Sequence, residues 1–112
     1  MDSGRVPVKE FINGQSVPVR EKIFSDLGRL VQFNVKLGPP YVRKVEGREF
    51  WELRTKVGSD IYRTFYFAHT GKKFVLLHAY QKKSQKAPRK ELDLAEERMS
   101  DYLRRFAKAK GR

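Results

Sequence analysis

The sequence lacks cysteine and long apolar runs. Without cysteine among its 112 residues, the chain has no disulfide framework, no cysteine-ligated zinc site and no thiol nucleophile. No uninterrupted apolar stretch approaches the ~20 residues that cross a bilayer, and the first residues lack the apolar core of a secretory signal. We therefore expect a soluble, cytoplasmic protein that has no membrane partner.

Metal-binding and common catalytic motifs are also missing. The two histidines, His69 and His78, stand apart, and the carboxylates are scattered or gathered where a last helix would begin. There is no glycine-rich phosphate loop, nucleophile elbow or glycosidase-type carboxylate pair. The sequence therefore predicts no metal and no other cofactor, and most enzyme classes are excluded.

Positive charge is abundant. Lysine and arginine number 25 against 13 acidic residues, which gives a formal net charge of +12 and a pI near 10.2. Such a balance predicts attraction to nucleic acid or another polyanion. The length fits one domain over residues 1–112, with a flexible tail at 108–112.

Helical periodicity is present at both ends of the chain. It predicts two N-terminal helices, from Pro7 to Gly14 and from Ser16 to Gly38, and a C-terminal helix after Pro88. Residues 41–47 are typical of a connector. Three short β-type runs lie between them, at residues 50–54, 61–67 and 74–80. We expect an α+β fold in which the N-terminal helices pack on a mainly antiparallel twisted sheet and a helix follows the last strand.

The segments between the β-type runs, 57–60 and 69–72, are typical of hairpin turns. If each turn has four loop residues, Lys56 pairs with Ile61 and Ala68 pairs with Lys73. On this register one sheet face carries an apolar set for the helices to cover: Trp51, Leu53, Val75, Leu77 and Ala79. Phe65, Phe67, Phe74 and Leu76 fall on the other face, where a returning helix, a partner chain or nucleobases would have to cover them.

The same register predicts a basic row on that other face. Arg54 lies opposite Arg63, and Arg63 lies opposite His78, with Tyr80 and Lys82 beside them. Facing like charges destabilise a ladder, and a bound phosphate would offset this. Alternatives remain open: the arginines can be solvated or paired with Glu52 or Asp60, and His78 and Tyr80 can be structural.

This row suits metal-free cleavage of RNA, in which the 2′-hydroxyl attacks the neighbouring phosphate. The reaction needs cations, a base and an acid. Arg54 and Arg63 can supply the cations, while His78, Lys82 or Lys83 can move protons. Tyr80 can stack a displaced base. Further RNA contacts are expected from Lys56, Gln85, Lys86 and Arg89.

An ordered set of segments carries a family resemblance: Trp51-Glu52-Leu53-Arg54, then Tyr62-Arg63-Thr64-Phe65-Tyr66, then Leu76-Leu77-His78-Ala79-Tyr80-Gln81-Lys82-Lys83. With Pro7 to Phe11 and Tyr41 to Gly47, this set resembles the phage-derived HigB-like branch of the RelE/ParE toxin superfamily. The resemblance implies a small RelE-like toxin that enters the ribosomal A site and cleaves mRNA as a metal-independent endoribonuclease. It also implies an antitoxin encoded alongside, expected to be a helix-turn-helix DNA-binding protein.

By position, Arg54 and Arg63 match the strand residues that contact the scissile phosphate in mRNA-cleaving members. Lys82 and Lys83 match the basic residues that follow the third β-type run. Pro88 and Arg89 stand where some relatives carry a tyrosine, so the acid and base are not assigned. Two alternatives share the fold: a ParE-like gyrase poison and a noncatalytic RNA-binding module.

Overall fold

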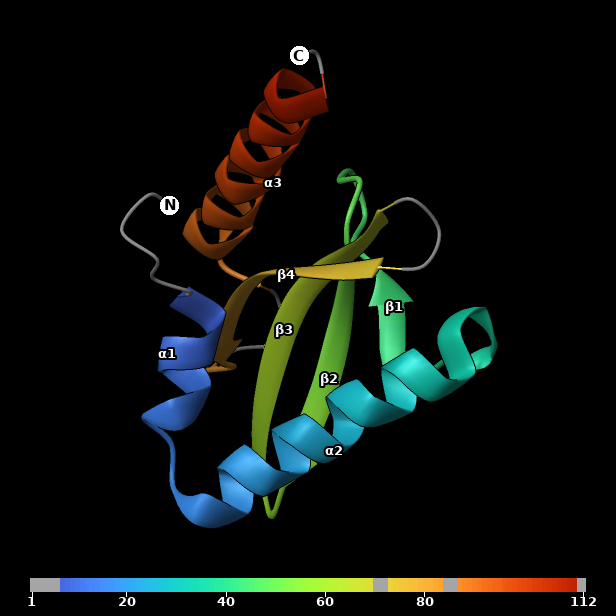
Figure 1. The fold of residues 1–112 in the computed structure, drawn as a ribbon. Coiled ribbons are helices and arrows are strands. Elements are labelled where there is room, and N and C mark those ends of the chain that lie inside the picture. The colour runs from blue at the N-terminus through green and yellow to red at the C-terminus, as the bar shows by residue number, and fades with distance from the viewer. Residues whose placement is uncertain (1–6, 70–72, 84–86, 111–112) are drawn as a thin grey trace.

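The computed structural model describes residues 7–69, 73–83 and 87–110. Its elements are α1 (Pro7–Asn13), α2 (Val17–Phe33), the short 3-10 helix η1 (Asn34–Lys36), β1 (Val42–Lys44), β2 (Trp51–Val57), β3 (Asp60–His69), β4 (Lys73–Gln81) and α3 (Arg89–Lys110). Figure 1 shows α2 lying across the sheet and α3 extending away from it. This arrangement confirms the α+β fold predicted from the sequence. Within the described residues, no helix combines the length and apolar character that a membrane crossing requires.

The sheet has four strands in the order β1-β2-β3-β4, and every neighbouring pair is antiparallel. Strand β1 lies inside the segment that the sequence predicts to be a connector. Three residues are too short for an alternation pattern to be recognised. The sequence therefore predicts three of the four strands.

The predicted register of the β2–β3 hairpin is confirmed. Lys56 pairs with Ile61, and Arg54 pairs with Arg63. The loop is shorter than expected because pairing continues up to a two-residue turn. Gly58 begins this turn with φ +62°, a conformation that glycine adopts without a steric penalty.

The predicted register of the β3–β4 hairpin is wrong. His69, and not Ala68, pairs with Lys73, so the two strands are already shifted by one residue at the turn. A β-bulge between Phe65 and Tyr66 adds a second residue to the shift. Further along the ladder, Arg63 therefore pairs with Tyr80 instead of His78.

The bulge also changes which side chains of β4 face which layer. Val75 and Leu77, expected under the N-terminal helices, belong to the core beneath α3. Phe74 and Leu76, expected on the opposite face, pack with the core beneath α2. An extra residue in one strand reverses the alternation beyond it, and a pattern with a period of two does not reveal where this happens.

Helices cover both faces of the sheet. On one face α1 and α2 bury an apolar side that includes Ile12, Ile23 and Leu30. On the other face α3 covers Phe65 with its own Ala95 and further apolar residues, so the chain itself covers this face. Helix α3 continues to Lys110 and thus includes the first three residues of the tail that the sequence predicts to be flexible.

Candidate functional site

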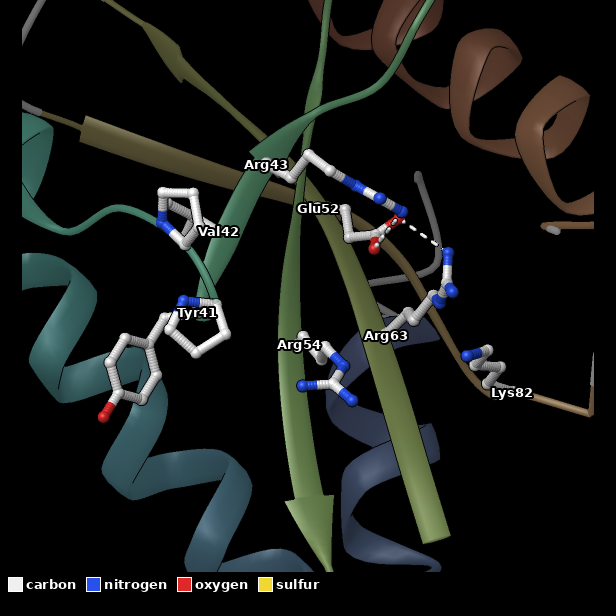
Figure 2. Close-up of a pocket in the computed structure, with 9 residues that line it drawn as sticks. Tyr41, Val42, Arg43, Glu52, Arg54, Arg63 and Lys82 are labelled. Carbon is white, nitrogen blue, oxygen red and sulfur yellow. Dashed lines mark hydrogen bonds and ion pairs between the residues drawn. The ribbon is translucent and has the colours of Figure 1, made fainter. Parts of the chain in front are cut away.

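A pocket of about 280 Å³ opens on the sheet face opposite α2, beside the short strand β1. Because side chains alternate along β2, Leu53 packs beneath α2 while Glu52 and Arg54 face the pocket. We call this hollow the cationic pocket, and Figure 2 shows the side chains around it. Its lining consists of Pro39, Pro40, Tyr41, Val42, Arg43, Glu52, Arg54, Arg63 and Lys82. Four of these side chains are cationic and one is a carboxylate.

Arg54 and Lys82 are the two cations of the pocket that remain available to a ligand. Neither forms an ion pair with any residue that the structure describes. Lys82 is held in place by its backbone, whose N–H donates to the carbonyl oxygen of Ile61 at 2.7 Å and extends the β3–β4 ladder. Both side chains are half-buried, so a phosphate between them would be partly desolvated, which strengthens charge-assisted hydrogen bonds.

Arg63 also lines the pocket, but it is buried and ion-paired. Its Nη1 lies 3.0 Å from Oε1 of Glu52, and the two side chains are only 5% and 6% exposed. Arg43, directly opposite Glu52 on β1, approaches the other carboxylate oxygen at 3.4 Å. Figure 2 shows the two guanidinium groups reaching Glu52 from different sides.

The burial of Arg63 corrects the prediction that its side chain faces outward. Tyr80, opposite Arg63 on β4, belongs to the core that α3 covers, and a buried guanidinium requires a charge partner. Glu52 is the diagonal neighbour of Arg63 across the β2–β3 ladder and can reach it. Pairing with Glu52 is one of the alternatives that the sequence leaves open.

Tyr80 lies opposite Arg63 on β4 and is buried in the core beneath α3. Its ring is 8% exposed and packs against Phe65 with the ring centroids 5.7 Å apart, so it is not available to stack a displaced base. Its hydroxyl makes no hydrogen bond of normal geometry to a described residue. Burial raises the pKa of Tyr80, and the nearby charge of Arg63 opposes part of that rise.

His78 does not reach the cationic pocket. Because of the bulge it lies beneath α3, where it contacts Glu91 through Nε2 and Arg98 through Nδ1. Arg98 can only donate, so Nδ1 is the acceptor in this contact and Nε2 carries the proton. The same guanidinium donates to the carbonyl oxygen of Leu77 at 3.0 Å, and burial lowers the pKa of Arg98. This arrangement favours the structural alternative for His78.

The other described residues that the sequence predicts to act on RNA lie outside the pocket lining. Lys83 follows the last strand and is exposed, as is Lys56 near the β2–β3 turn. The side chain of Arg89, the first residue of α3, is 87% exposed. Gln85 and Lys86 lie outside the described residues.

The sequence does not single out Arg43 or Tyr41, because both fall in the segment predicted to be a connector. The carbonyl oxygen of Tyr41 accepts a hydrogen bond of 2.8 Å from the backbone N–H of Arg54, which holds Tyr41 at the pocket wall. Its side chain is 39% exposed, and the guanidinium of Arg29 lies over the ring at 5.2 Å. Figure 2 shows this ring directed away from Arg54 and Lys82.

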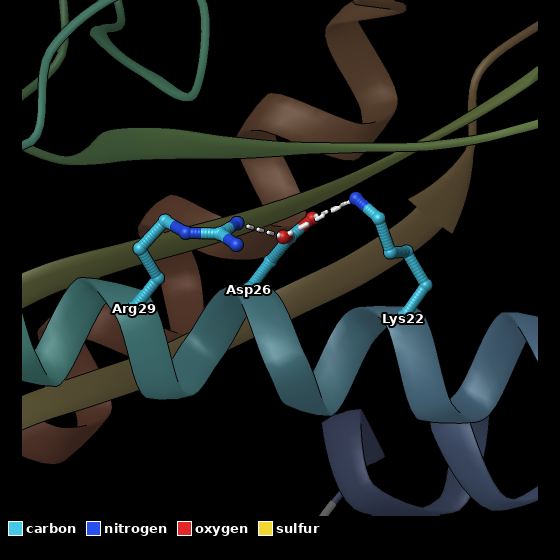
Figure 3. Close-up of polar contacts among 3 residues, drawn as sticks. All are labelled: Lys22, Asp26 and Arg29. Carbon is cyan, nitrogen blue, oxygen red and sulfur yellow. Dashed lines mark hydrogen bonds and ion pairs between the residues drawn. The ribbon is translucent and has the colours of Figure 1, made fainter.

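Arg29 is itself held by a buried carboxylate on α2. Asp26 is 1% exposed and lies 2.9 Å from Arg29 and 3.4 Å from Lys22, as Figure 3 shows. The chain of contacts from Asp26 through Arg29 to Tyr41 links α2 to the pocket wall. The two ion pairs of Asp26 follow from helical spacing within α2, whereas the contact between Arg29 and Tyr41 joins separate elements and no sequence pattern indicates it.

A second hollow of about 410 Å³ adjoins the cationic pocket. The two hollows share Arg43, Glu52 and Arg63, and the second continues towards the start of α3 at Leu92. A ligand longer than one phosphate can therefore extend from one hollow into the other. Among the described residues, no three histidine, aspartate or glutamate side chains come together as metal ligands.

Comparison with known proteins identifies the family. Residues 10–100 match the model of the family described as phage derived protein Gp49-like (DUF891). A search of curated proteins finds no significant match. The matched segment runs from α1 into α3 and includes every residue of the cationic pocket. The chain therefore belongs to the Gp49-like family of phage-derived, toxin-like proteins, within the RelE/HigB-like toxin superfamily.

Proposed function

We propose that this protein is the toxin of a type II toxin-antitoxin system, of the HigB-like branch, and that it cleaves mRNA on the ribosome. Membership of a toxin-like family implies a cognate antitoxin. The observation that carries the proposal is the cationic pocket, where four cations surround one carboxylate. Such a pocket fits the phosphate of a nucleic acid.

In the proposed reaction, the 2′-oxygen of one nucleotide forms a bond to the adjacent phosphorus while the bond to the 5′-oxygen breaks. A base accepts the 2′-hydroxyl proton, and an acid protonates the departing 5′-oxygen. Arg54 and Lys82 would hold the phosphate oxygens, on which charge accumulates in the transition state. Arg63, which is buried and ion-paired with Glu52, would add positive electrostatic potential at the phosphate.

The proton-transfer roles fall to residues near the pocket rim. Lys82 lines the pocket and Lys83 follows it directly, whereas His78 is held under α3. No base-stacking role is assigned to Tyr80, because its ring is buried. The nucleotide next to the scissile phosphate would occupy the second hollow.

The test uses pocket residues whose replacement spares the buried ion pair. Purified Arg54→Gln and Lys82→Gln variants are incubated with programmed ribosomes, and the mRNA ends are mapped. We expect wild-type protein to cleave within codons and each variant to lose about 10²- to 10³-fold in cleavage rate. Arg104→Gln is the matched control, since Arg104 is 70% exposed on α3 and pairs with Asp101 away from the pocket.

Other outcomes would assign the fold to a different activity. Intact mRNA together with trapped gyrase complexes would contradict the proposal and indicate a ParE-like poison. RNA binding that depends on Arg54 without any cleavage on the ribosome would indicate a noncatalytic RNA-binding module. Cleavage that persists in both pocket variants would show that the cationic pocket is not the active site.

A further inference from the structure

The outward side of α2 carries a row of apolar side chains that nothing in the described chain covers. Val17, Phe24 and Val31 are 52%, 49% and 68% exposed. They stand seven residues apart, so they lie along one side of the helix over about 21 Å. Isolated exposed apolar residues are ordinary on protein surfaces, but a row with this spacing is the seam that one helix presents to another. We call this row the α2 stripe.

A glycine lies within the stripe. Gly28 is four residues after Phe24 and three before Val31, and therefore lies on the same side of α2. A Cβ atom at Gly28 would meet no heavy atom within 4 Å. Glycine weakens a helix interior, and the packing of this chain gives no reason for it here. A glycine in an apolar seam allows the backbone of a second helix to approach closely.

We propose that the α2 stripe is the docking site for an amphipathic helix of an acidic protein, which, if the proposed function holds, is the cognate antitoxin. Charge selects this occupant over a second copy of the chain. Two copies would each carry a formal net charge of +12 over the whole chain and would repel one another, whereas an acidic helix is attracted. Helix α2 itself carries Arg20, Lys22 and Arg29 against Glu21 and Asp26, with Lys22 and Arg29 paired to the buried Asp26, and Lys36 follows in η1.

The position of the stripe has a consequence for inhibition. Helix α2 covers one sheet face with its inner side, and the cationic pocket opens on the other face. A helix bound on the outer side of α2 leaves the pocket accessible. The proposed partner and a small phosphate ligand are therefore expected to bind independently.

The experiment uses the full chain and, as probe, the protein encoded by the adjacent reading frame. Gly28→Gln and Phe24→Gln are expected to weaken the complex at least 10-fold, measured by calorimetry, without lowering Tm. Phe33→Gln is the matched control, because Phe33 is 45% exposed but lies off the stripe on the same helix. It is expected to bind within twofold of wild type.

Three results would overturn the proposal. The first is unchanged binding by both stripe variants, and the second is failure of the adjacent protein to bind the wild-type chain. The third is a dimer of the chain alone that Gly28→Gln dissociates, since the occupant is then a second copy. Cleavage of mRNA by the free variants, expected to be unchanged, is measured in parallel and tests the proposed function separately.

Discussion

The ion pair between Glu52 and Arg63 is expected to stabilise the fold and to weaken the binding of an anion in the cationic pocket. Replacing Glu52 with glutamine keeps the shape of the side chain but removes the only carboxylate that lines the cationic pocket. Arg63 then stays buried, at 5% side-chain exposure, without the negative charge that lies 3.0 Å away. Glu52→Gln is therefore expected to destabilise the fold and, at the same time, to tighten anion binding.

The magnitude follows from burial. Removing one partner of a buried ion pair costs about 3 to 5 kcal/mol, and the glutamine oxygen can still accept one hydrogen bond, so we expect a loss of about 2 to 4 kcal/mol. For a domain of this size the corresponding drop in Tm is roughly 8 to 17 °C. Arg63→Gln should cost less, because Arg43 remains 3.4 Å from the carboxylate that is left behind.

Urea unfolding of wild type, both single variants and the double variant measures the coupling between the two side chains. Binding of a short RNA is measured in parallel at fixed salt, with Asp93→Asn as the control for loss of one negative charge elsewhere. Asp93 is 58% exposed and pairs with Arg48. Stability of Glu52→Gln within about 0.5 kcal/mol of wild type, or weaker RNA binding by it than by the control, would refute the reasoning.

Three further predictions concern the surroundings of the site. Burial raises the pKa of Tyr66 to about 12, so the stabilisation from its neutral hydroxyl is complete below pH ~10 and is lost as the pH rises towards 12. In urea unfolding at different pH values, Tyr66→Phe should reduce this alkaline loss of stability by up to about 3 kcal/mol. An unchanged alkaline loss would contradict the raised pKa of Tyr66. Arg48→Gln removes the contacts of 2.7 Å to Asp93 and 3.4 Å to Glu96 on α3. It should speed hydrogen exchange at the start of α3 and lower the free energy of unfolding by about 1 kcal/mol. Exchange equal to wild type would show that the start of α3 does not depend on Arg48. Asp26→Asn should cost about 1 to 3 kcal/mol and broaden the NMR signals of the Tyr41 ring, and sharp, unshifted signals would disprove the link through Arg29.

The sequence predicts most of the fold, because most helices, strands and turns are determined by residues close to one another in the chain. The apolar spacing of the helices and the glycine of the β2–β3 turn are visible in the sequence, and the register of Arg54 against Arg63 follows from that turn. The short strand β1 and the β-bulge opposite Phe65 cannot be recognised in the sequence, because each involves too few residues to produce or interrupt an alternation pattern. The first accounts for the missing strand, and the bulge accounts for one of the two residues by which the predicted β3–β4 register is wrong; the other arises at the turn, where His69 pairs with Lys73.

The site was predictable as far as it depends on strand alternation. Arg54 and Lys82 line the pocket as expected from their places along β2 and after β4. The burial of Arg63 depends on the packing around β3, and the choice of Glu52 as partner depends on the diagonal geometry of two strands. Such facts belong to the tertiary structure, so the sequence leaves pairing and solvation of the arginine as alternatives.

The β-bulge has a consequence for chemistry as well as for packing. Without it, the pairing set at the turn would continue along the ladder, so that Arg63 would face Ala79 and His78 would face Thr64. The shift brings Tyr80 to that position and carries His78 beneath α3, where Arg98 and Glu91 occupy both ring nitrogens. An imidazole bound at both nitrogens cannot take a substrate proton without first breaking a contact. If the proposed mRNA cleavage holds, His78→Gln should therefore lower stability more than it lowers the cleavage rate per folded molecule, whereas Lys82→Gln should do the reverse. A cleavage defect in His78→Gln that exceeds that of Lys82→Gln at equal folded fraction would place the histidine in the candidate active site.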